Sequence, residues 1–383
     1  MNWHLASGYF MRIAHVCPRY YPAMGGAEEV IKNYAEGMAA RGHEVAVFCS
    51  DEDVKSSAEE VLNGVKVVRC HSYPLKLFHS YSLYPSILRK LMQFKPDLIH
   101  THGTRYFASD VGAIAAKVLR KPLVFNPYAG QFLTTKLGKV HQKIVGWLSF
   151  RADAVITISQ YEKDLVEKGG VHPKRWVHLP VGIDPRPYDD VEENVYERFG
   201  LTWEPIILSL GRLVPHKGLD TLLKAAPAVL EKFAQTRFFI AGQDYGMRLE
   251  LAALAEKLGI TKSVIFSGGL SEEDKYSAFK NATVFCLPSR SEAFGVVLIE
   301  AMAARLPTVG TNWMSIPEII DDGQTGYLFP LDDHESLASR LIELLGDDLL
   351  RRRMGEAGRQ KVEEKYSWPK ILDKLESLYL ELK

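Results

Sequence analysis

The feature that most constrains this sequence is an alternation of short apolar runs with helix-length segments, which pauses once and then restarts. Apolar runs rich in β-branched residues predict buried strands, and the longer segments between them have helical spacing. Such alternation is typical of parallel sheets covered by helices on both faces. The strands expected in the first half are Arg12–Val16, Glu44–Cys49, Val65–Cys70, Asp97–Thr101, Leu123–Asn126, Ala154–Ile158 and Trp176–Leu179.

Helices are expected between these strands, and the second half repeats the pattern. The first-half helices are Ala27–Arg41, Leu83–Gln93, Ser109–Leu119, Val140–Phe150 and Gln160–Lys168. The second-half strands are Ile206–Leu210, Arg237–Ala241, Val264–Phe266, Thr283–Cys286 and Thr308–Val309. The second-half helices are Leu219–Lys232, Met247–Leu258, Glu272–Lys280 and Val296–Ala304, and the chain after about Asp333 is expected to be nearly all helical.

The alternation pauses at a stretch rich in Pro, Gly and acidic residues, LPVGIDPRPYDDVEEN, over 179–194. A segment of this composition without an apolar period is typical of a linker. We therefore predict two doubly wound α/β domains, at 1–180 and 201–365, joined by a linker at 181–200 and followed by a final helix at 366–383.

The charge of the chain is balanced overall but not along its length. The 383 residues hold 47 basic and 47 acidic side chains, and a net charge of zero argues against nucleic acid as a partner. Residues 1–180 nevertheless hold 23 basic and 15 acidic residues, a net of +8, which leaves −8 for 181–383. Such asymmetry suggests surfaces with different partners.

The cysteines and the apolar runs bear on localisation. The four cysteines, at 17, 49, 70 and 286, form no C-x-x-C pair and are expected to be reduced, buried thiols of a cytoplasmic protein. The first ten residues lack the basic and apolar regions of a signal peptide. No run of about 18 apolar residues predicts a membrane-spanning helix.

Ligands of doubly wound sheets bind at the carboxyl ends of strands, so residues directly after predicted strands are the candidates for function. In the first half, Gly25 and Gly26 open a helix, where backbone N–H groups attract phosphate. An ordinary tight turn explains this glycine pair equally well. His100 and His102 end the strand Asp97–Thr101, and a structural or a metal-binding role is the alternative to one in catalysis.

In the second half, two loops carry charged candidates. Gly211 and Arg212 follow one strand, and Lys217 precedes a helix; both cations suit a diphosphate, although solvated basic residues are the alternative. Glu292 lies in the loop after Thr283–Cys286, before a helix. The free N–H groups of Gly295, Val296 and Val297 at the start of that helix suit a phosphate.

Glu300 lies in an almost wholly apolar part of that helix. A carboxylate in such surroundings needs a partner. The hydroxyls of a polyol are one candidate, and pairing within the protein is the alternative. The sequence Asp51-Glu52-Asp53 formally matches a D-x-D metal motif, but a solvated loop is the favoured interpretation, so no metal site is predicted.

Together these motifs resemble the family-4 (group 1) retaining glycosyltransferases of the GT-B fold, from Met11 to the C-terminus. The resemblance is carried by HVCPRYYPAMGGAEEV (15–30), DLIHTHG (97–103), ADAVITIS (152–159), VGID (181–184), LGRLVPHKG (210–218) and PSRSEAFGVVLIEAMA (288–303). The last contains the E-x7-E signature of the family, with Glu292 and Glu300.

The resemblance implies a role for each candidate residue. Arg212 and Lys217 would hold the donor diphosphate, Glu292 the sugar hydroxyls and Glu300 the nucleotide ribose. His102 would orient the sugar beside its anomeric carbon. The other donor-binding positions that it implies are Gly25, Gly26, Gly211, Gly268, Phe294, Gly295, Val296 and Val297.

The chemistry implied by the resemblance is transfer of a hexose from a UDP- or GDP-sugar, with retention of configuration, to a glycan or lipid-linked acceptor. Fixed cations and helix amides would stabilise the leaving phosphate, so neither a metal nor a cofactor is expected. The first domain would bind the acceptor, the second the nucleotide sugar, and the final helix would cross back to the first. Two departures from the family pattern, Val181-Gly182 and VGTNWMSIPE after Pro307, affect sugar or acceptor contacts.

The first half also suggests an anionic partner. No acidic residue occurs from Val111 to Ala152, which contains seven basic residues, and Leu75–Lys95 is basic and aromatic. Basic residues beside apolar ones suit docking to an anionic membrane, which would make the protein peripheral at the inner face. An anionic acceptor explains the same charge. Two functions remain as alternatives to transfer: a nucleotide-sugar epimerase of the same fold, and a non-catalytic nucleotide-sugar-binding subunit.

Overall fold

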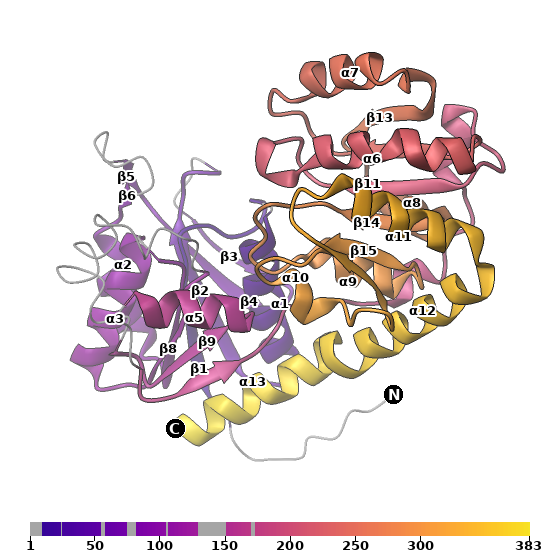
Figure 1. The fold of residues 1–383 in the computed structure, drawn as a ribbon. Helices are drawn as coiled ribbons and strands as arrows, with labels where there is room; N and C mark the ends of the chain where they lie inside the picture. Colours follow the sequence, from indigo (N-terminus) through magenta and orange to yellow (C-terminus); the bar gives the residue numbers. More distant parts are fainter. Residues whose placement is uncertain are drawn as a thin grey trace. The chain divides into compact units, whose positions relative to one another are not determined.

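The computed structural model describes residues 10–23, 25–54, 58–74, 82–104, 106–128, 151–169 and 173–383. The chain forms two compact units, each built on its own sheet. Unit 1 contains residues 1–181 and 368–383, and unit 2 contains residues 182–367. Figure 1 colours unit 1 from indigo to magenta, with its last helix in yellow. The predicted helix Val140–Phe150 lies outside the described residues.

The sheet of unit 1 has the strand order β10-β9-β8-β7-β1-β2-β4-β3 and is parallel except for the edge strand β3. A separate antiparallel pair is formed by β5 and β6. The strands are β1 Arg12–Val16, β2 Glu44–Ser50, β3 Glu59–Leu62, β4 Val65–Cys70, β5 Tyr73–Pro74, β6 Ser82–Leu83, β7 Leu98–His102, β8 Leu123–Asn126, β9 Ala154–Thr157 and β10 Trp176–His178. The described helices are α1 Gly26–Ala40, α2 Ser86–Phe94, α3 Phe107–Leu119, α5 Gln160–Lys168 and α13 Trp368–Leu382.

The sheet of unit 2 is wholly parallel, in the order β13-β12-β11-β14-β15-β16. Its strands are β11 Ile206–Leu210, β12 Arg237–Ala241, β13 Val264–Gly268, β14 Val284–Leu287, β15 Thr308–Thr311 and β16 Gly326–Phe329. Its helices are α6 Leu219–Lys232, α7 Arg248–Lys257, α8 Glu272–Asn281, α9 Val296–Ala303, α10 Ile316–Ile319, α11 His334–Gly346 and α12 Asp348–Lys361. Short helical turns lie at Arg186–Tyr188, Val195–Phe199, Pro215–Lys217, Thr261–Ser263 and Val362–Tyr366.

The two parallel sheets confirm the predicted fold class of two doubly wound α/β domains. A strand covered on both faces of a sheet is apolar at nearly every position, so such strands leave continuous apolar runs in the sequence. Ile206–Leu210 and Leu123–Asn126 have the predicted bounds. The short strands β3, β5, β6 and β16 were not predicted.

The segment that was predicted to be a linker, 181–200, is instead packed on unit 2 from Gly182 onwards. Tyr188, Val195 and Tyr196 are buried, and the Tyr196 hydroxyl donates to the carbonyl of Ala278 at 2.7 Å. Residues with this composition therefore extend the core of unit 2, and the boundary between the units lies at 181–182.

The last helix, α13, belongs to unit 1, although the residues directly before it belong to unit 2. Asp373 and Glu376 bind the guanidinium of Arg41 next to the end of α1, at 2.8 and 3.2 Å. The buried hydroxyl of Tyr379 lies 2.6 Å from Nδ1 of His100. These contacts attach α13 to the sheet of unit 1 as well as to its helices. In the described residues, no helix combines the length and the apolar character needed to cross a bilayer.

Candidate active site

The candidate residues of unit 2 lie at the point where its strand order reverses. The chain runs from β11 outwards to β12 and β13, and then returns to place β14 on the other side of β11. Loops that leave the carboxyl ends of two such strands diverge and form a crevice for ligands. The loop after β11 carries Gly211, Arg212 and Lys217, and the loop after β14 carries Glu292.

These two loops are fixed to each other by Arg290. Its backbone N–H donates to the carbonyl of His216 at 2.8 Å, and its guanidinium donates to the carbonyl of Pro215 at 3.0 Å. Gly218 has a φ of +64°, and a Cβ there would lie only 2.0 Å from the carbonyl oxygen of Pro288. Glycine at 218 thus permits a close approach that determines where Lys217 lies relative to Glu292.

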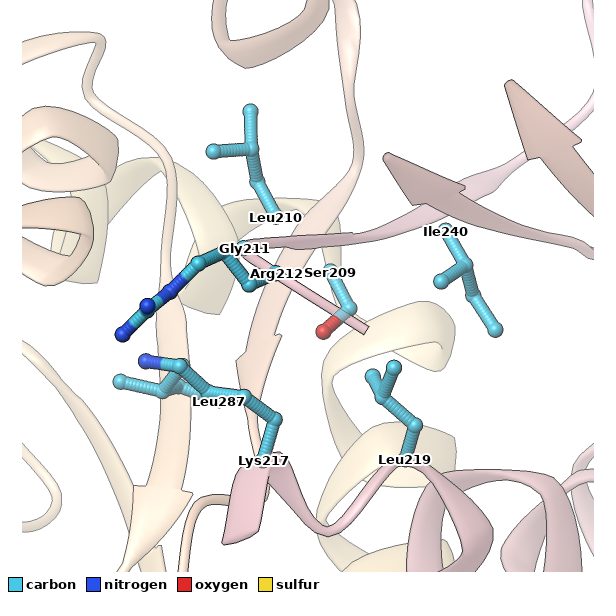
Figure 2. A pocket seen from close by; sticks show the side chains of 8 residues that line it. All are labelled: Ser209, Leu210, Gly211, Arg212, Lys217, Leu219, Ile240 and Leu287. Atoms are coloured by element: carbon cyan, nitrogen blue, oxygen red, sulfur yellow. The ribbon is translucent and has the colours of Figure 1, made fainter. Parts of the chain in front are cut away.

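Arg212 and Lys217 line one small pocket, together with Ser209, Leu210, Gly211, Leu219, Ile240 and Leu287. Figure 2 shows the guanidinium of Arg212 and the ammonium of Lys217 pointing in the same direction from this pocket. Gly211 has a φ of +155°, and a Cβ built on it would meet Cε of Lys217 at 3.5 Å. The pocket therefore presents two cations of different geometry, a fork and a point charge, which together suit a diphosphate.

Lys217 and Glu292 form an ion pair, with Nζ 2.6 Å from Oε2 and each side chain 16% exposed. The residues predicted to hold the phosphate and the sugar are thus brought together, 75 positions apart in the chain. Both side chains are thus partly buried. The pKa of the neighbouring His216 is lowered by burial first and then by the charges of Lys217 and Arg212.

The start of α9 lies beside this pair. Gly295 precedes the helix with a φ of +98°, and its N-cap position has no side-chain hydrogen bond. Ser315 donates to the carbonyl oxygens of Glu292 and Phe294 at 2.9 and 3.1 Å, which attaches this loop, with its buried Phe294 side chain, to the residues after β15. Val296 and Val297 form the first turn, where backbone N–H groups have no helical acceptor.

Glu300 lies one turn further along α9, and its partners come from the protein. Its Oε1 lies 2.9 Å from Nζ of Lys275 on α8 and accepts a hydrogen bond from the Tyr188 hydroxyl at 3.3 Å. Burial alone lowers the pKa of Lys275, but the carboxylates of Glu300 and Glu272 outweigh it and raise that pKa. Pairing within the protein, the alternative left open by the sequence, is therefore present.

Gly268 is the last residue of β13, which pairs with β12, the strand that ends directly before Gly242. It has a φ of +78°, and its carbonyl accepts a hydrogen bond from the N–H of Gly242 at 2.8 Å. A Cβ at 268 would meet nothing within 4 Å. The open space beside this residue is compatible with its predicted place among the donor-binding positions.

In unit 1, His102 ends β7 at the corresponding reversal of strand order, between β1 and β7. The side chain is fully buried, and its Nε2 lies 2.9 Å from Nδ1 of His15. His15 belongs to β1, where it is in register with His100. The sequence pattern alone does not single out His15, because only the pairing of β1 with β7 places it beside His102.

His100 completes a cluster of three buried histidines in which one ring nitrogen of each lies within 4.8 Å of the other two, a spacing compatible with a metal ion. Both ring nitrogens of His100 are, however, engaged: Nε2 lies 2.7 Å from Oδ1 of Asn126, and Nδ1 contacts the Tyr379 hydroxyl. A metal would have to displace one of them. Burial is the main cause that lowers the pKa of all three histidines, so they are neutral at pH 7.

The glycine pair at the start of α1 lies in unit 1 as well. Gly25 is the N-cap residue in extended conformation, and a Cβ there would overlap the carboxylate of Glu28 at 2.4 Å. A Cβ at Gly26 would meet nothing within 4 Å. The space beside Gly26 is therefore open, as a backbone-to-ligand contact requires.

The loop Asp51–Asp53 is solvated at Glu52 and Asp53, as predicted, but not at Asp51. Asp51 is buried, and its Oδ1 accepts hydrogen bonds from the N–H and hydroxyl of Ser72 at 3.0 and 2.9 Å. His71 contacts its other oxygen at 2.9 Å. Asp51 thus joins the end of β2 to the residues after β4, which a D-x-D pattern alone does not reveal.

Much of the basic stretch predicted to meet the acceptor or a membrane lies outside the described residues. This applies to Lys136, Lys139 and Lys143, and to the aromatic residues Phe78, Tyr81, Phe132 and Trp147. The described part includes α3, which exposes Ile114, Lys117 and Val118 to solvent, and Arg120 directly after the helix is exposed as well. Ile114, Lys117 and Val118 have the spacing of a single helix face.

Comparisons with known proteins all indicate glycosyltransferases. Residues 197–361 match the family described as glycosyl transferases group 1, and residues 24–186 match glycosyltransferase family 4. The chain is 30% identical over 387 residues to an uncharacterized glycosyltransferase of Methanocaldococcus jannaschii, covering 96% of this chain and 98% of the relative. It is 28% identical over 381 residues to the phosphatidyl-myo-inositol mannosyltransferase of Mycobacterium leprae, covering 96% of each chain.

The fold is also similar to solved structures. HepE of Anabaena, solved in complex with UDP, matches with a TM-score of 0.80 at 19% identity, over 97% of this chain and 100% of that one. Sucrose-phosphate synthase of Thermosynechococcus elongatus matches with a TM-score of 0.76 at 22% identity, over 97% and 99%. Both likenesses agree with the two-domain arrangement of sheets described above.

Proposed function

Because the chain belongs to the group 1 glycosyltransferases, which have the GT-B fold, we propose that it moves a hexose from a UDP- or GDP-sugar to a glycan or lipid-linked acceptor. The observation that carries this proposal is the arrangement of Arg212, Lys217 and Glu292 at the strand reversal of unit 2. Two cations for a diphosphate lie there beside a carboxylate that accepts hydroxyl hydrogen bonds. The relatives named above include a mannosyltransferase and a protein solved with UDP.

In the proposed reaction, the bond between the anomeric carbon and the diphosphate oxygen breaks, and the acceptor hydroxyl attacks the same face. Negative charge develops on the leaving phosphate, so its stabilisation by Arg212, Lys217 and the first-turn amides of α9 is the main catalytic contribution of this unit. Glu292, released from Lys217, would accept hydrogen bonds from the sugar. These groups perform the task without a bound metal, and we propose a metal-independent, retaining transfer.

His102 is proposed to orient the sugar from unit 1. Its neutral state suits a hydrogen bond with a hydroxyl, because a neutral imidazole has one donor and one acceptor nitrogen. The contact with His15 uses Nε2 of His102 and leaves Nδ1 as a buried atom with no hydrogen-bond partner in the described residues. Nδ1 is therefore the nitrogen proposed to face the donor.

The acceptor is proposed to be glycan or lipid-linked, with unit 1 as the part that binds it. Among relatives, one is a phosphatidyl-myo-inositol mannosyltransferase and another a sulfoquinovosyl transferase of Arabidopsis thaliana. The exposed face of α3, with Lys117 beside Ile114 and Val118, is suited to an anionic membrane surface. We propose that the protein contacts the inner face of such a membrane peripherally.

The test supplies UDP-, GDP- and ADP-hexoses in turn, with and without vesicles that contain phosphatidylinositol, and follows release of the nucleoside diphosphate. Release that requires vesicles, together with a glycolipid product whose anomeric configuration by NMR equals that of the donor, is the expected result. Activity should persist in EDTA. Turnover of the donor at the same rate without acceptor would favour an epimerase, and Lys217→Ala with unchanged turnover would contradict the site.

A further inference from the structure

The carboxylate of Glu300 is held in an asymmetric way. Both of its hydrogen-bonding partners, Lys275 and Tyr188, contact Oε1, at 2.9 and 3.3 Å. Within the described part of the chain, Oε2 of Glu300 has no hydrogen bond or ion pair. The side chain is only 10% exposed, so one oxygen is anchored in the protein and the other keeps its acceptor capacity in a largely buried place.

The two anchoring residues are themselves fixed. Lys275 also binds Glu272, at 2.9 Å, one turn earlier on α8. Tyr188 is buried, and its ring packs edge-on against Tyr276 with the centroids 4.9 Å apart. An anchor that is fixed by its own contacts limits the rotamers available to the carboxylate that it holds.

We propose that Lys275, assisted by Tyr188, is a positioning residue for nucleotide recognition: it fixes Oε1 of Glu300, so that Oε2 is directed to a ribose hydroxyl of the donor. This proposal rests on the proposed function, in which Glu300 meets the ribose. It adds two residues outside the E-x7-E signature, one on α8 and one in the turn Arg186–Tyr188.

Lys275 affects the charge balance of the Glu300 carboxylate as well as its orientation. A carboxylate buried without a cation is costly and rotates or takes up a proton. Lys275 compensates that charge without occupying Oε2, and the second carboxylate on Lys275, from Glu272, keeps the ammonium in place. A hydroxyl that then binds Oε2 meets an ionised, oriented acceptor, which forms a stronger hydrogen bond than a neutral one.

The experiment measures discrimination between ribose and deoxyribose. The probe is whichever of UDP, GDP and ADP binds the wild-type protein most tightly, compared by calorimetry with its 2′-deoxy and 3′-deoxy counterparts. We expect wild-type protein to bind the ribonucleotide about tenfold or more tighter than at least one counterpart, as for loss of a hydrogen bond to a charged group. In Lys275→Met the ratio should fall to about threefold or less, and in Lys275→Arg it should partly return.

Two further variants keep the proposal falsifiable. Tyr188→Phe removes one anchoring hydrogen bond without leaving Glu300 unpaired, so it tests positioning even if Lys275→Met folds poorly; its ratio should lie between those of wild type and Lys275→Met. Lys257→Met, on the exposed side of α7, removes the same charge from unit 2 and should leave the ratio unchanged.

The outcomes separate the two levels of the argument. If wild-type protein discriminates and the ratio stays the same in both Lys275→Met and Tyr188→Phe, the positioning role is wrong, while the proposed function stands. If wild-type protein binds the ribonucleotide and its two deoxy counterparts equally tightly, or binds none of them, the role of Glu300 in the proposed function is wrong.

Discussion

The ion pair between Lys217 and Glu292 leads to a prediction that separates binding from catalysis. In Glu292→Gln, the affinity for a nucleoside diphosphate without a sugar should increase, although sugar transfer decreases. The cation proposed to bind phosphate is already paired with a carboxylate 2.6 Å away. A diphosphate must displace that carboxylate, and the amide of glutamine is a much weaker competitor.

The magnitude follows from the geometry of the pair. Two unit charges 2.6 Å apart attract each other by about 6 kcal/mol at an effective dielectric constant of about 20. Most of this is offset by the cost of removing both charges from water, since each side chain is only 16% exposed. A remaining net contribution of about 1–2 kcal/mol would strengthen diphosphate binding by roughly 5- to 30-fold once the carboxylate is gone.

Calorimetry with UDP, GDP or ADP, at a fixed ionic strength, provides the assay. The matched control is Glu256→Gln, which removes the same charge from the exposed surface of α7. A gain in affinity with Glu292→Gln and none with Glu256→Gln would identify a local competition for Lys217. Affinity equal to or weaker than that of wild type in Glu292→Gln would refute the reasoning. An equal gain in both variants would show that the overall charge of the unit, and not the local pair, causes the effect.

Three other predictions concern separate parts of the molecule. Lys217→Ala should weaken binding of the same nucleotide about tenfold or more with an unchanged circular dichroism spectrum, since a charge-assisted contact is lost; unchanged affinity would contradict this. Burial lowers the pKa of His15 from 6.5 to about 3, so the contribution of its neutral form to the stability of the fold should be complete above pH 6.5 and decrease as the pH falls. The melting temperature of His15→Gln should therefore fall less steeply with decreasing pH than that of wild type, and equal slopes would argue against this. Co-sedimentation with anionic vesicles should fade with salt and weaken in Lys117→Glu or Val118→Ser, but not in Lys257→Glu; no binding at low salt would end the membrane proposal.

The sequence was most informative where burial requires a single kind of residue. Val284–Leu287 and Ile206–Leu210 are buried strands, and their apolar runs predicted them within one residue. The edge strand Glu59–Leu62 was missed because its side chains are exposed or half-buried and two of them are charged. The strand β16 was also missed. It begins at Gly326, where a Cβ would lie 2.0 Å from the carbonyl oxygen of Thr308, and no sequence pattern predicts so close an approach.

The candidate site could be located from the sequence, but its pairings could not. Residues that follow strands were expected at one edge of a sheet, and Arg212, Lys217 and Glu292 do lie there. The partners of Glu300 and His102 depend on which elements become neighbours. Lys275 reaches Glu300 because α8 and α9 pack together, and His15 reaches His102 because β1 pairs with β7.

The opposite charges of the two units give the Lys217–Glu292 pair a further consequence. Divided at the observed boundary, unit 1 holds 26 basic and 18 acidic residues and unit 2 holds 21 and 29, so the net charges are still +8 and −8. At physiological salt, charges beyond about 8 Å are largely screened, so the short-range groups decide whether an anion binds to unit 2. There Lys217 is neutralised by Glu292, and a free phosphate gains the cation only by leaving the carboxylate unpaired. A nucleotide sugar offers phosphate to Lys217 and hydroxyls to Glu292, and so compensates both. The pair therefore favours a ligand that carries both groups over an anion alone.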